Sequence, residues 1–195
     1  MTPSPSALLF AGFCALLLFP SCSDYRVSLT YQPPGPNQRV LRGAPVVDMG
    51  RVNDVRDVRG TEIGAVRNEV GIPIKVLHAK KPIAEITHNA FAYALEVRGM
   101  LAKRSSRYLI STEILELWCH QYASLDAGCR IRVNVMRRGS SRPVFSKIYA
   151  AKRTRPTPNV TYWSKVDELA AVTSEALQAV VDGAIDDPAL RRALR

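Results

Sequence analysis

The chain has 195 residues, of which 47% are hydrophobic and 23% are charged. This composition is typical of a globular protein and excludes disorder along most of the chain. The formal net charge of +10 would suggest nucleic-acid binding in a cytoplasmic protein. The N-terminus predicts export, however, and the basic clusters lack the interleaved aromatic side chains of a base-stacking surface, so we expect no nucleic-acid partner.

Residues 1–21 are typical of a bacterial lipoprotein signal peptide. Residues 7–19 form an uncharged apolar run, too short for the roughly 20 residues of a membrane-spanning helix but suited to a secretory signal. The residues that follow, Phe19-Pro20-Ser21-Cys22, resemble a lipobox, in which a small residue precedes the cysteine. Cys22 is therefore the predicted lipidation site; the alternative is an ordinary thiol in a secreted protein.

A lipobox implies a diacylglyceryl thioether and an N-acyl chain on Cys22, and two or more acyl chains hold a protein stably on a bilayer. Ser23 follows the cysteine, where inner-membrane retention in enteric bacteria typically uses Asp. The resemblance therefore implies the outer membrane, with the protein facing the periplasm. Residues 22–43 contain a Pro- and Gly-rich stretch and predict a flexible tether behind the lipidated cysteine. Residues 44–195 predict a single periplasmic domain.

The first half of this domain predicts two strands and a helix. Residues 44–52 and 72–77 are rich in β-forming side chains, and the polar, glycine-containing stretch between them is expected to be a loop. From Pro82, apolar side chains recur at spacings of three and four until Gly99. This pattern predicts an amphipathic helix over residues 82–98.

The second half predicts a meander of three strands followed by a second helix. Ser164 is the expected start of this helix and Pro188 ends it, with one apolar stripe between them. The order β-β-α-β-β-β-α predicts an α+β domain, in which an antiparallel sheet of about five strands carries two amphipathic helices on one face. The predicted strands of the meander are 108–122, 130–136 and 143–152, with a turn over 124–128.

Cys119 and Cys129 form an even pair once Cys22 is assigned to the lipid. In an exported protein such a pair raises the possibility of a disulfide. The two cysteines flank the predicted turn, so they could face each other across it. The alternative is two buried free thiols.

Basic residues form candidate anion-binding clusters next to the predicted strands. In a bacterial envelope the accessible anions are phospholipid headgroups, lipopolysaccharide phosphates and peptidoglycan carboxylates, and a basic surface would attract each of them. The alternative is that these side chains are solvated and bind no ligand. The candidates are Lys103, Arg104, Arg107, Arg137 and Arg138.

The sequence contains no catalytic motif, and we expect neither a metal nor a cofactor. His78, His88 and His120 are scattered without metal-ligand spacing. There is no nucleophile-elbow, P-loop or dinucleotide-binding glycine motif. Glu113 and Glu116 occupy an odd and an even position of one predicted strand, which places them on opposite faces and argues against a catalytic carboxylate pair.

The order of these parts resembles the YajG family of bacterial lipoproteins. The likeness rests on the lipobox-like segment ending at Cys22, the VVDMGRVNDVRD strand and loop, the helix ending Val97-Arg98-Gly99 and the final helix running into AIDDPAL. The resemblance implies an outer-membrane lipoprotein and transfers no catalytic residue. We expect a non-enzymatic binding or structural module in envelope assembly or maintenance. The alternative is an accessory lipoprotein subunit of a multiprotein envelope transport or assembly complex, with an envelope protein as its partner.

Overall fold

The computed structural model of the protein describes residues 23–32, 44–58, 60–68, 70–156 and 166–195. The predicted signal peptide and the predicted lipidation site, Cys22, lie outside the described residues. Residues 33–43, which belong to the predicted tether, also lie outside them.

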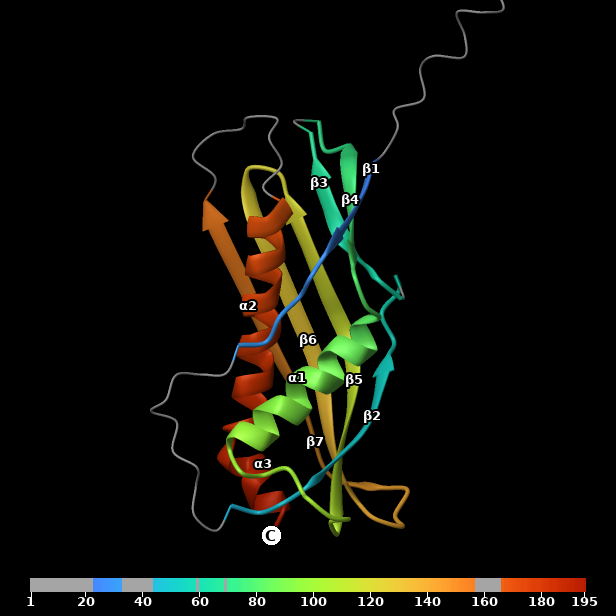
Figure 1. Ribbon diagram of the computed structural model, residues 1–195, viewed down its shortest axis with the longest axis vertical. Helices are drawn as coiled ribbons and strands as arrows, with labels where there is room; N and C mark the ends of the chain where they lie inside the picture. Colours follow the sequence, from blue (N-terminus) through green and yellow to red (C-terminus); the bar gives the residue numbers. More distant parts are fainter. Residues whose placement is uncertain (1–22, 33–43, 59, 69, 157–165) are drawn as a thin grey trace, which may run out of the picture.

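A seven-stranded sheet is covered on one face by two helices, α1 (Ile83–Val97) and α2 (Val166–Ile185) (Figure 1). The predicted α+β class and the placement of both helices on one side of the sheet are confirmed. The short α3 (Pro188–Ala193) follows α2. The strands are β1 (Ser23–Val27), β2 (Asp48–Asp54), β3 (Glu62–Arg67), β4 (Pro73–Ala79), β5 (Tyr108–Gln121), β6 (Ser124–Arg137) and β7 (Pro143–Pro156).

The sheet is mixed, which corrects the expected antiparallel sheet of about five strands. Its order is β1-β4-β3-β5-β6-β7, and β2 pairs with β5 beside β3. The β5-β6-β7 meander is antiparallel, but β1 runs parallel to β4, and β2 and β3 run parallel to β5. Strand β3 falls in a stretch predicted to be a loop because of its glycines. Gly64 belongs to the strand instead. The position requires glycine because the backbone of β5 approaches so closely that a Cβ would collide with the carbonyl oxygen of Cys119.

Residues 23–32 are part of the folded domain, although the sequence suggested that they belong to the tether. Strand β1 pairs with β4 from Ser23 onward, and Val27 and Leu29 are buried in the core. The backbone N–H of Thr30 donates to Ser174 Oγ on α2 at 3.1 Å. Among the described residues, strand pairing therefore starts at Ser23, which follows Cys22 directly in the sequence.

The meander turns at Tyr122 and Ala123, so the turn predicted over residues 124–128 is wrong. Asp126 and Gly128 lie in β6 itself. The Asp126 carboxylate accepts hydrogen bonds from Ser124 Oγ at 2.5 Å and Thr154 Oγ1 at 2.6 Å. Gly128 pairs with Trp118 across the β5–β6 ladder, where an aromatic side chain covers a strand glycine. Partners on β5, β6 and β7 thus let turn-forming residues join the ladder.

The core lies between the helices and the inner face of the sheet. Each helix presents one apolar stripe to the sheet, as the spacing of apolar residues predicted. Side chains that are completely buried there include Phe91 and Leu95 from α1, Leu169 and Leu177 from α2, and Ile110, Ile114 and Ile131 from the meander.

Candidate functional site: the basic end of the sheet

The structure brings the five predicted anion-binding residues to one end of the sheet, which we call the basic end. Strand β5 starts at Tyr108 and β6 ends at Arg137, and these two residues pair. The backbone N–H of Arg138 donates to the carbonyl oxygen of Arg107 at 2.8 Å. Lys103 and Arg104 lie in the loop that leads into β5. Residues distant in sequence thus form one cationic surface.

Asp48 and Ser106 organise this surface, and neither was among the predicted site residues. Asp48 Oδ2 accepts a hydrogen bond from the backbone N–H of Ser106 at 2.9 Å and also pairs with the Arg138 guanidinium. Ser106 Oγ donates to the carbonyl oxygen of Val46 at 2.8 Å, and Arg138 Nε donates to the carbonyl oxygen of Ser106 at 3.0 Å. These bonds fix the loop before β5 to the start of β2.

Most of the charge on the basic end is available to a ligand. Lys103, Arg104, Arg107 and Arg137 are all exposed. Within the described part of the chain, Lys103, Arg104 and Arg137 have no polar side-chain partner, and the Arg107 guanidinium lies 5.5 Å from the centre of the Tyr108 ring. Exposed cations of this kind can bind carboxylate or phosphate groups, with an affinity that falls as salt screens the charges.

The basic end lies at the opposite end of the sheet from Ser23 (Figure 1). Strand pairing shows this directly, because Ser23 pairs with Lys75, Lys75 with Val66, and Val66 with Gln121, the last residue of β5. The basic end adjoins the first residue of the same strand. A strand of 14 residues spans roughly 45 Å at about 3.3 Å per residue.

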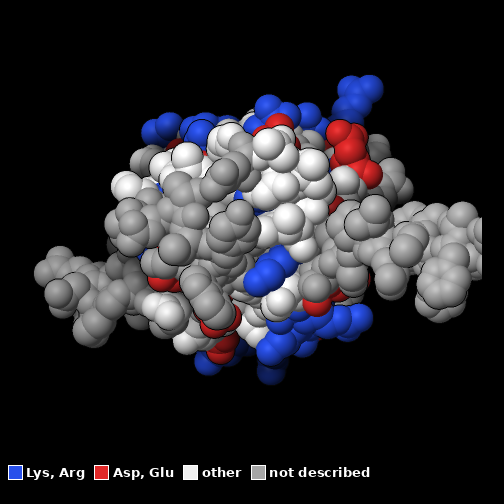
Figure 2. Space-filling view, turned by 90° about the horizontal axis from the view of Figure 1, so that it is seen from above, with Lys and Arg blue, Asp and Glu red and all other residues white. Residues whose placement is uncertain are grey.

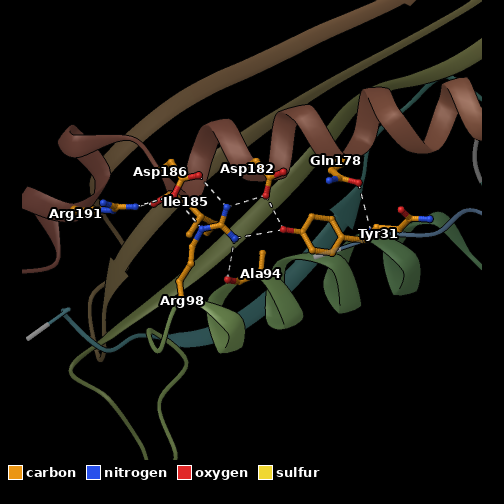
Figure 3. Close-up of polar contacts among 9 residues, drawn as sticks. Tyr31, Ala94, Arg98, Gln178, Asp182, Ile185, Asp186 and Arg191 are labelled. Atoms are coloured by element: carbon orange, nitrogen blue, oxygen red, sulfur yellow. Dashed lines mark hydrogen bonds and ion pairs between the residues drawn. The ribbon is translucent and has the colours of Figure 1, made fainter. Parts of the chain in front are cut away.

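A second polar cluster surrounds Arg98 at the end of α1, and it is structural (Figure 3). The Arg98 side chain is 3% exposed, and each of its five N–H groups has an acceptor. Nε and Nη2 donate to Asp186, Nη2 also to Asp182, and Nη1 to Tyr31 Oη and the carbonyl oxygen of Ala94. No donor is left for a ligand.

The same cluster changes the acidity of its members. Burial, together with the hydrogen bond to Asp182, raises the pKa of Tyr31 to about 12. Burial by itself would lower the pKa of Arg98, but the hydrogen bonds to Asp186, Tyr31 and Asp182 raise it overall. The phenol therefore stays neutral and the guanidinium charged, which is the state that holds segment 28–32 against the helices.

Arg56 fills a gap in the sheet and leaves no free donor either. Strands β2 and β3 both pair with β5, β2 along its first half and β3 near its end. Arg56 bridges the space between the two strands. Its guanidinium binds Asp54 and the carbonyl oxygens of Gly60, Glu62 and Leu117. The hollow beside it, of about 220 Å³, therefore borders an arginine whose five N–H groups are all used.

Glu113 and Glu116 lie on the same face of β5, which corrects the prediction that they lie on opposite faces. The register with β6 shifts between Ile114 and Glu116, where β5 contains one extra residue. This bulge places Glu116 on the same face of the sheet as Glu113. Each carboxylate is paired with an arginine of β6. Arg132 Nη1 lies 2.5 Å from Glu113 Oε2, and Arg130 Nη2 lies 2.9 Å from Glu116 Oε1.

Cys119 and Cys129 are free buried thiols, the second of the two alternatives that the sequence left open. The strand register separates them, because Cys129 pairs with Leu117 and Cys119 pairs with Ala127. Burial raises the pKa of the Cys119 thiol to about 11 and that of the Cys129 thiol to about 12. Both side chains pack in the core as small apolar groups.

Among the described residues, no group of three or more His, Cys, Asp and Glu side chains is placed to hold a metal ion. The helices within the described ranges are all too short or too polar to cross a membrane.

Comparisons with known proteins show the fold of this chain but no family. No protein-family model and no curated protein matches the sequence. A crystal structure of a Xanthomonas campestris protein assigned to the family model DUF330 is similar with a TM-score of 0.58 at 16% identity, covering 84% of this chain and 92% of that one. This likeness shows a shared fold.

Two further solved structures are less similar. A hypothetical protein from Chlamydia trachomatis has a TM-score of 0.48 at 10% identity, covering 78% of this chain and 98% of that one. A Caulobacter crescentus protein described as a candidate lipoprotein has a TM-score of 0.39 at 5% identity, covering 73% of this chain and 86% of that one.

Proposed function

We propose that this protein is a lipid-anchored, non-catalytic binding module of the bacterial outer membrane, which faces the periplasm and acts in envelope assembly or maintenance. Acyl chains on Cys22 would hold it at the bilayer, and the basic end would bind an anionic partner. We also infer that it is a YajG-like lipoprotein, on the strength of the sequence resemblance.

The observation that carries this proposal is the placement of Ser23 and the basic end at opposite ends of the sheet. With Cys22 at the membrane, the basic end would lie roughly 45 Å away along β5. If the long axis of the sheet points away from the membrane, headgroups of the anchoring membrane are too distant to be its ligand. Peptidoglycan carboxylates, which lie deeper in the periplasm, are the anionic group that this arrangement favours.

Binding to purified peptidoglycan sacculi tests the basic end. Replacing Lys103, Arg104, Arg107 and Arg137 with Gln should reduce co-sedimentation of the lipidated protein several-fold, and salt should weaken binding of the unchanged protein. A matched control replaces four exposed cations outside the basic end, namely Arg26, Lys80, Lys152 and Arg153, which removes the same net charge. Equal loss in both variants, or binding that salt does not affect, would refute the proposal for this surface.

Cell fractionation tests the anchor. Cys22→Ser should move the protein from the outer-membrane fraction to the soluble periplasm, because the acyl chains supply most of the membrane affinity. A Cys22→Ser protein that stays in the membrane fraction would remove the anchor from the proposal. Lipidated protein found only in the inner membrane would correct the predicted compartment.

A second candidate function is that of an accessory lipoprotein subunit in a multiprotein envelope transport or assembly complex. The edge strand β7 supports it, because within the described chain its 14 residues pair only with β6. Val144 and Ile148 are exposed on this strand, and an open strand edge can accept a partner strand. Crosslinking in cells from β7 should trap one dominant envelope protein, whereas recovery of peptidoglycan alone would favour the first candidate.

A further inference from the structure

The end of the sheet that contains Ser23 carries two exposed turns, which we call the tip. A row of residues that pair from strand to strand crosses the sheet next to the tip and marks its boundary. Beyond this row lie the β3–β4 turn, with Val70 and Ile72, and the β5–β6 turn, with Tyr122. The row, in sheet order, is Ser23, Lys75, Val66, Gln121, Leu125 and Arg155.

The tip exposes large apolar side chains. Val70 is 77% exposed and Ile72 is 55% exposed, the two highest values among the large hydrophobic residues that the structure describes. Tyr122 is 51% exposed. Exposed apolar groups that gather at one place are a common mark of an interaction site, and each costs free energy as long as water covers it.

Hydrogen bonds hold the β3–β4 turn in this exposed conformation. Asn68 Oδ1 accepts from the backbone N–H groups of Val70 at 3.1 Å and Ile72 at 2.8 Å. Arg67 Nη1 donates to the carbonyl oxygen of Gly71 at 2.9 Å, and Gly71 has the positive φ of 83° that such a turn requires. The turn therefore presents Val70 and Ile72 to the surroundings and does not fold them back onto the sheet.

The chain itself indicates what covers the tip. Cys22 is joined to Ser23 by one peptide bond, and Ser23 is level with Lys75. Strands β1 and β4 are parallel, so the chain before each strand lies at the same end of the sheet. Ile72, which directly precedes β4 and lies three residues before Lys75, is therefore about 10 Å beyond Lys75 at the end where β1 starts. If Cys22 carries acyl chains, Ser23 is one residue away from the bilayer surface, and with the sheet upright the turn extends about 10 Å past the level of Ser23 toward that bilayer.

The surface around the tip fits a bilayer. Seen from this end, uncharged side chains form much of the visible surface, a Lys or Arg side chain lies among them, and both basic and acidic side chains lie around the rim (Figure 2). The Lys75 ammonium lies 4.8 Å from the centre of the Tyr25 ring, and Arg67 and Arg155 are exposed. Apolar groups bordered by cations and tyrosines are the arrangement of proteins that rest on phospholipid headgroups.

We propose that the tip docks on the phospholipid bilayer that anchors Cys22, with Val70, Ile72 and Tyr122 at the boundary between headgroups and acyl chains. This inference rests on the lipid anchor of the proposed function. Docking fixes the long axis of the sheet away from the membrane and so directs the basic end into the periplasm.

Depth-dependent fluorescence quenching tests the docking. The lipidated full-length protein is reconstituted into phosphatidylethanolamine–phosphatidylglycerol vesicles that contain spin-labelled lipid, after labelling Ile72→Cys with an environment-sensitive fluorophore. The control is Ser140→Cys, an exposed position in the turn between β6 and β7 at the opposite end. Only the introduced thiol reacts, because Cys119 and Cys129 are 2% and 3% exposed and the sulfur of Cys22 is acylated. We expect emission from position 72 to shift to shorter wavelength and to be quenched several-fold more than emission from position 140.

A second measurement separates docking by the protein from insertion of the dye. A label at Tyr122→Cys should lose most of its quenching when Val70 and Ile72 are both changed to Ser. The matched control changes Val144 and Ile148 to Ser, which removes the same two side-chain types from another exposed surface and should leave the quenching unchanged.

The outcomes distinguish this proposal from the anchor on which it rests. Mass spectrometry that finds no acyl chain on Cys22 would overturn both. Acylated protein whose labels at 72 and 140 are equally unquenched would overturn the docking alone. A wavelength shift at 72 that spin-labelled lipid does not affect, together with crosslinks between copies at this position, would assign the tip to a protein contact and also overturn the docking.

Discussion

Arg98 and Asp186 form a bidentate ion pair in which Nε lies 2.9 Å from Oδ1 and Nη2 lies 2.8 Å from Oδ2 (Figure 3). The pair joins the end of α1 to the residue that follows α2, 88 positions later in the chain. Tyr31 Oη also donates to Asp182 Oδ1 at 2.6 Å, so the segment after β1 is tied to the same group of charges. One buried guanidinium thus connects three parts of the fold.

Replacing Arg98 with Lys should destabilise the domain by about 3 kcal/mol, because an ammonium group cannot bind all five acceptors and leaves buried polar groups unpaired. The free energy of unfolding, measured by urea titration, checks this. Arg191→Lys is the control, since Arg191 pairs with the same Asp186 but is 26% exposed, and we expect a change below about 0.5 kcal/mol. Similar effects of the two substitutions would contradict a structural role for burial at Arg98.

Gly128→Ala should destabilise the protein by about 1–3 kcal/mol through overpacking, because the added Cβ would lie 2.5 Å from the Trp118 ring. Unfolding of the single and double variants measures the coupling. In a Trp118→Leu background the same substitution should be neutral or stabilising, since Ala loses less backbone entropy than Gly on folding. A cost that is unchanged in the Trp118→Leu background would show that the ring is not the obstacle.

Neither Cys119 nor Cys129 should react with a thiol reagent in the folded, lipidated protein at mildly alkaline pH. Burial raises both pKa values, to about 11 and about 12, and the thiolate is the reactive form. Both thiols should react once guanidinium chloride unfolds the chain. Chromogenic thiol titration counts the reactive groups, and a chain without reactive thiols after unfolding would mean that the disulfide forms after all.

Acid should weaken the contact between β7 and α3 at Asp187. The hydrogen bonds from Lys147 and Tyr149 lower the pKa of this carboxyl to about 2, and the side chain also caps α3 through the N–H of Ala189. Because the folded pKa lies below the unfolded one, the stabilisation is complete above about pH 4 and is lost as pH falls toward about 2.

The Asp187→Asn variant isolates this effect, because Asn keeps the cap and removes the charge. We expect it to be less stable than the unchanged protein by about 1 kcal/mol near neutral pH, since the Lys147 side of the pair is solvated. The two unfolding free energies should converge toward about pH 2. A difference that stays constant with pH would contradict the pKa assignment.

The sequence predicted the features that depend on near neighbours in the chain. The apolar spacing between Pro82 and Gly99 was sufficient for α1, and strict alternation over Ile131, Val133 and Val135 was sufficient for the core of β6. It failed where glycine or a polar residue belongs to a strand. Gly64 and Gly128 look like turn residues, but each allows a close approach that only the neighbouring strand reveals.

The candidate site shows the same division. The five cations were visible as local clusters, whereas Asp48 and Ser106, which bind Arg138 and fix the loop before β5, were not predicted. Glu113 and Glu116 share a face because a bulge shifts the register by one residue, and the alternation rule assumes that no bulge is present.

Sequence by itself determined the helices, the meander and the excess of positive charge, because periodicity and charge are fixed by residues a few positions apart. Tertiary structure decided that residues 23–32 belong to the domain, that the sheet is mixed, and that the basic end lies opposite Ser23. Those features depend on pairings between residues that are about 50 to 150 positions apart, and no local pattern specifies which distant strand or helix a segment will meet.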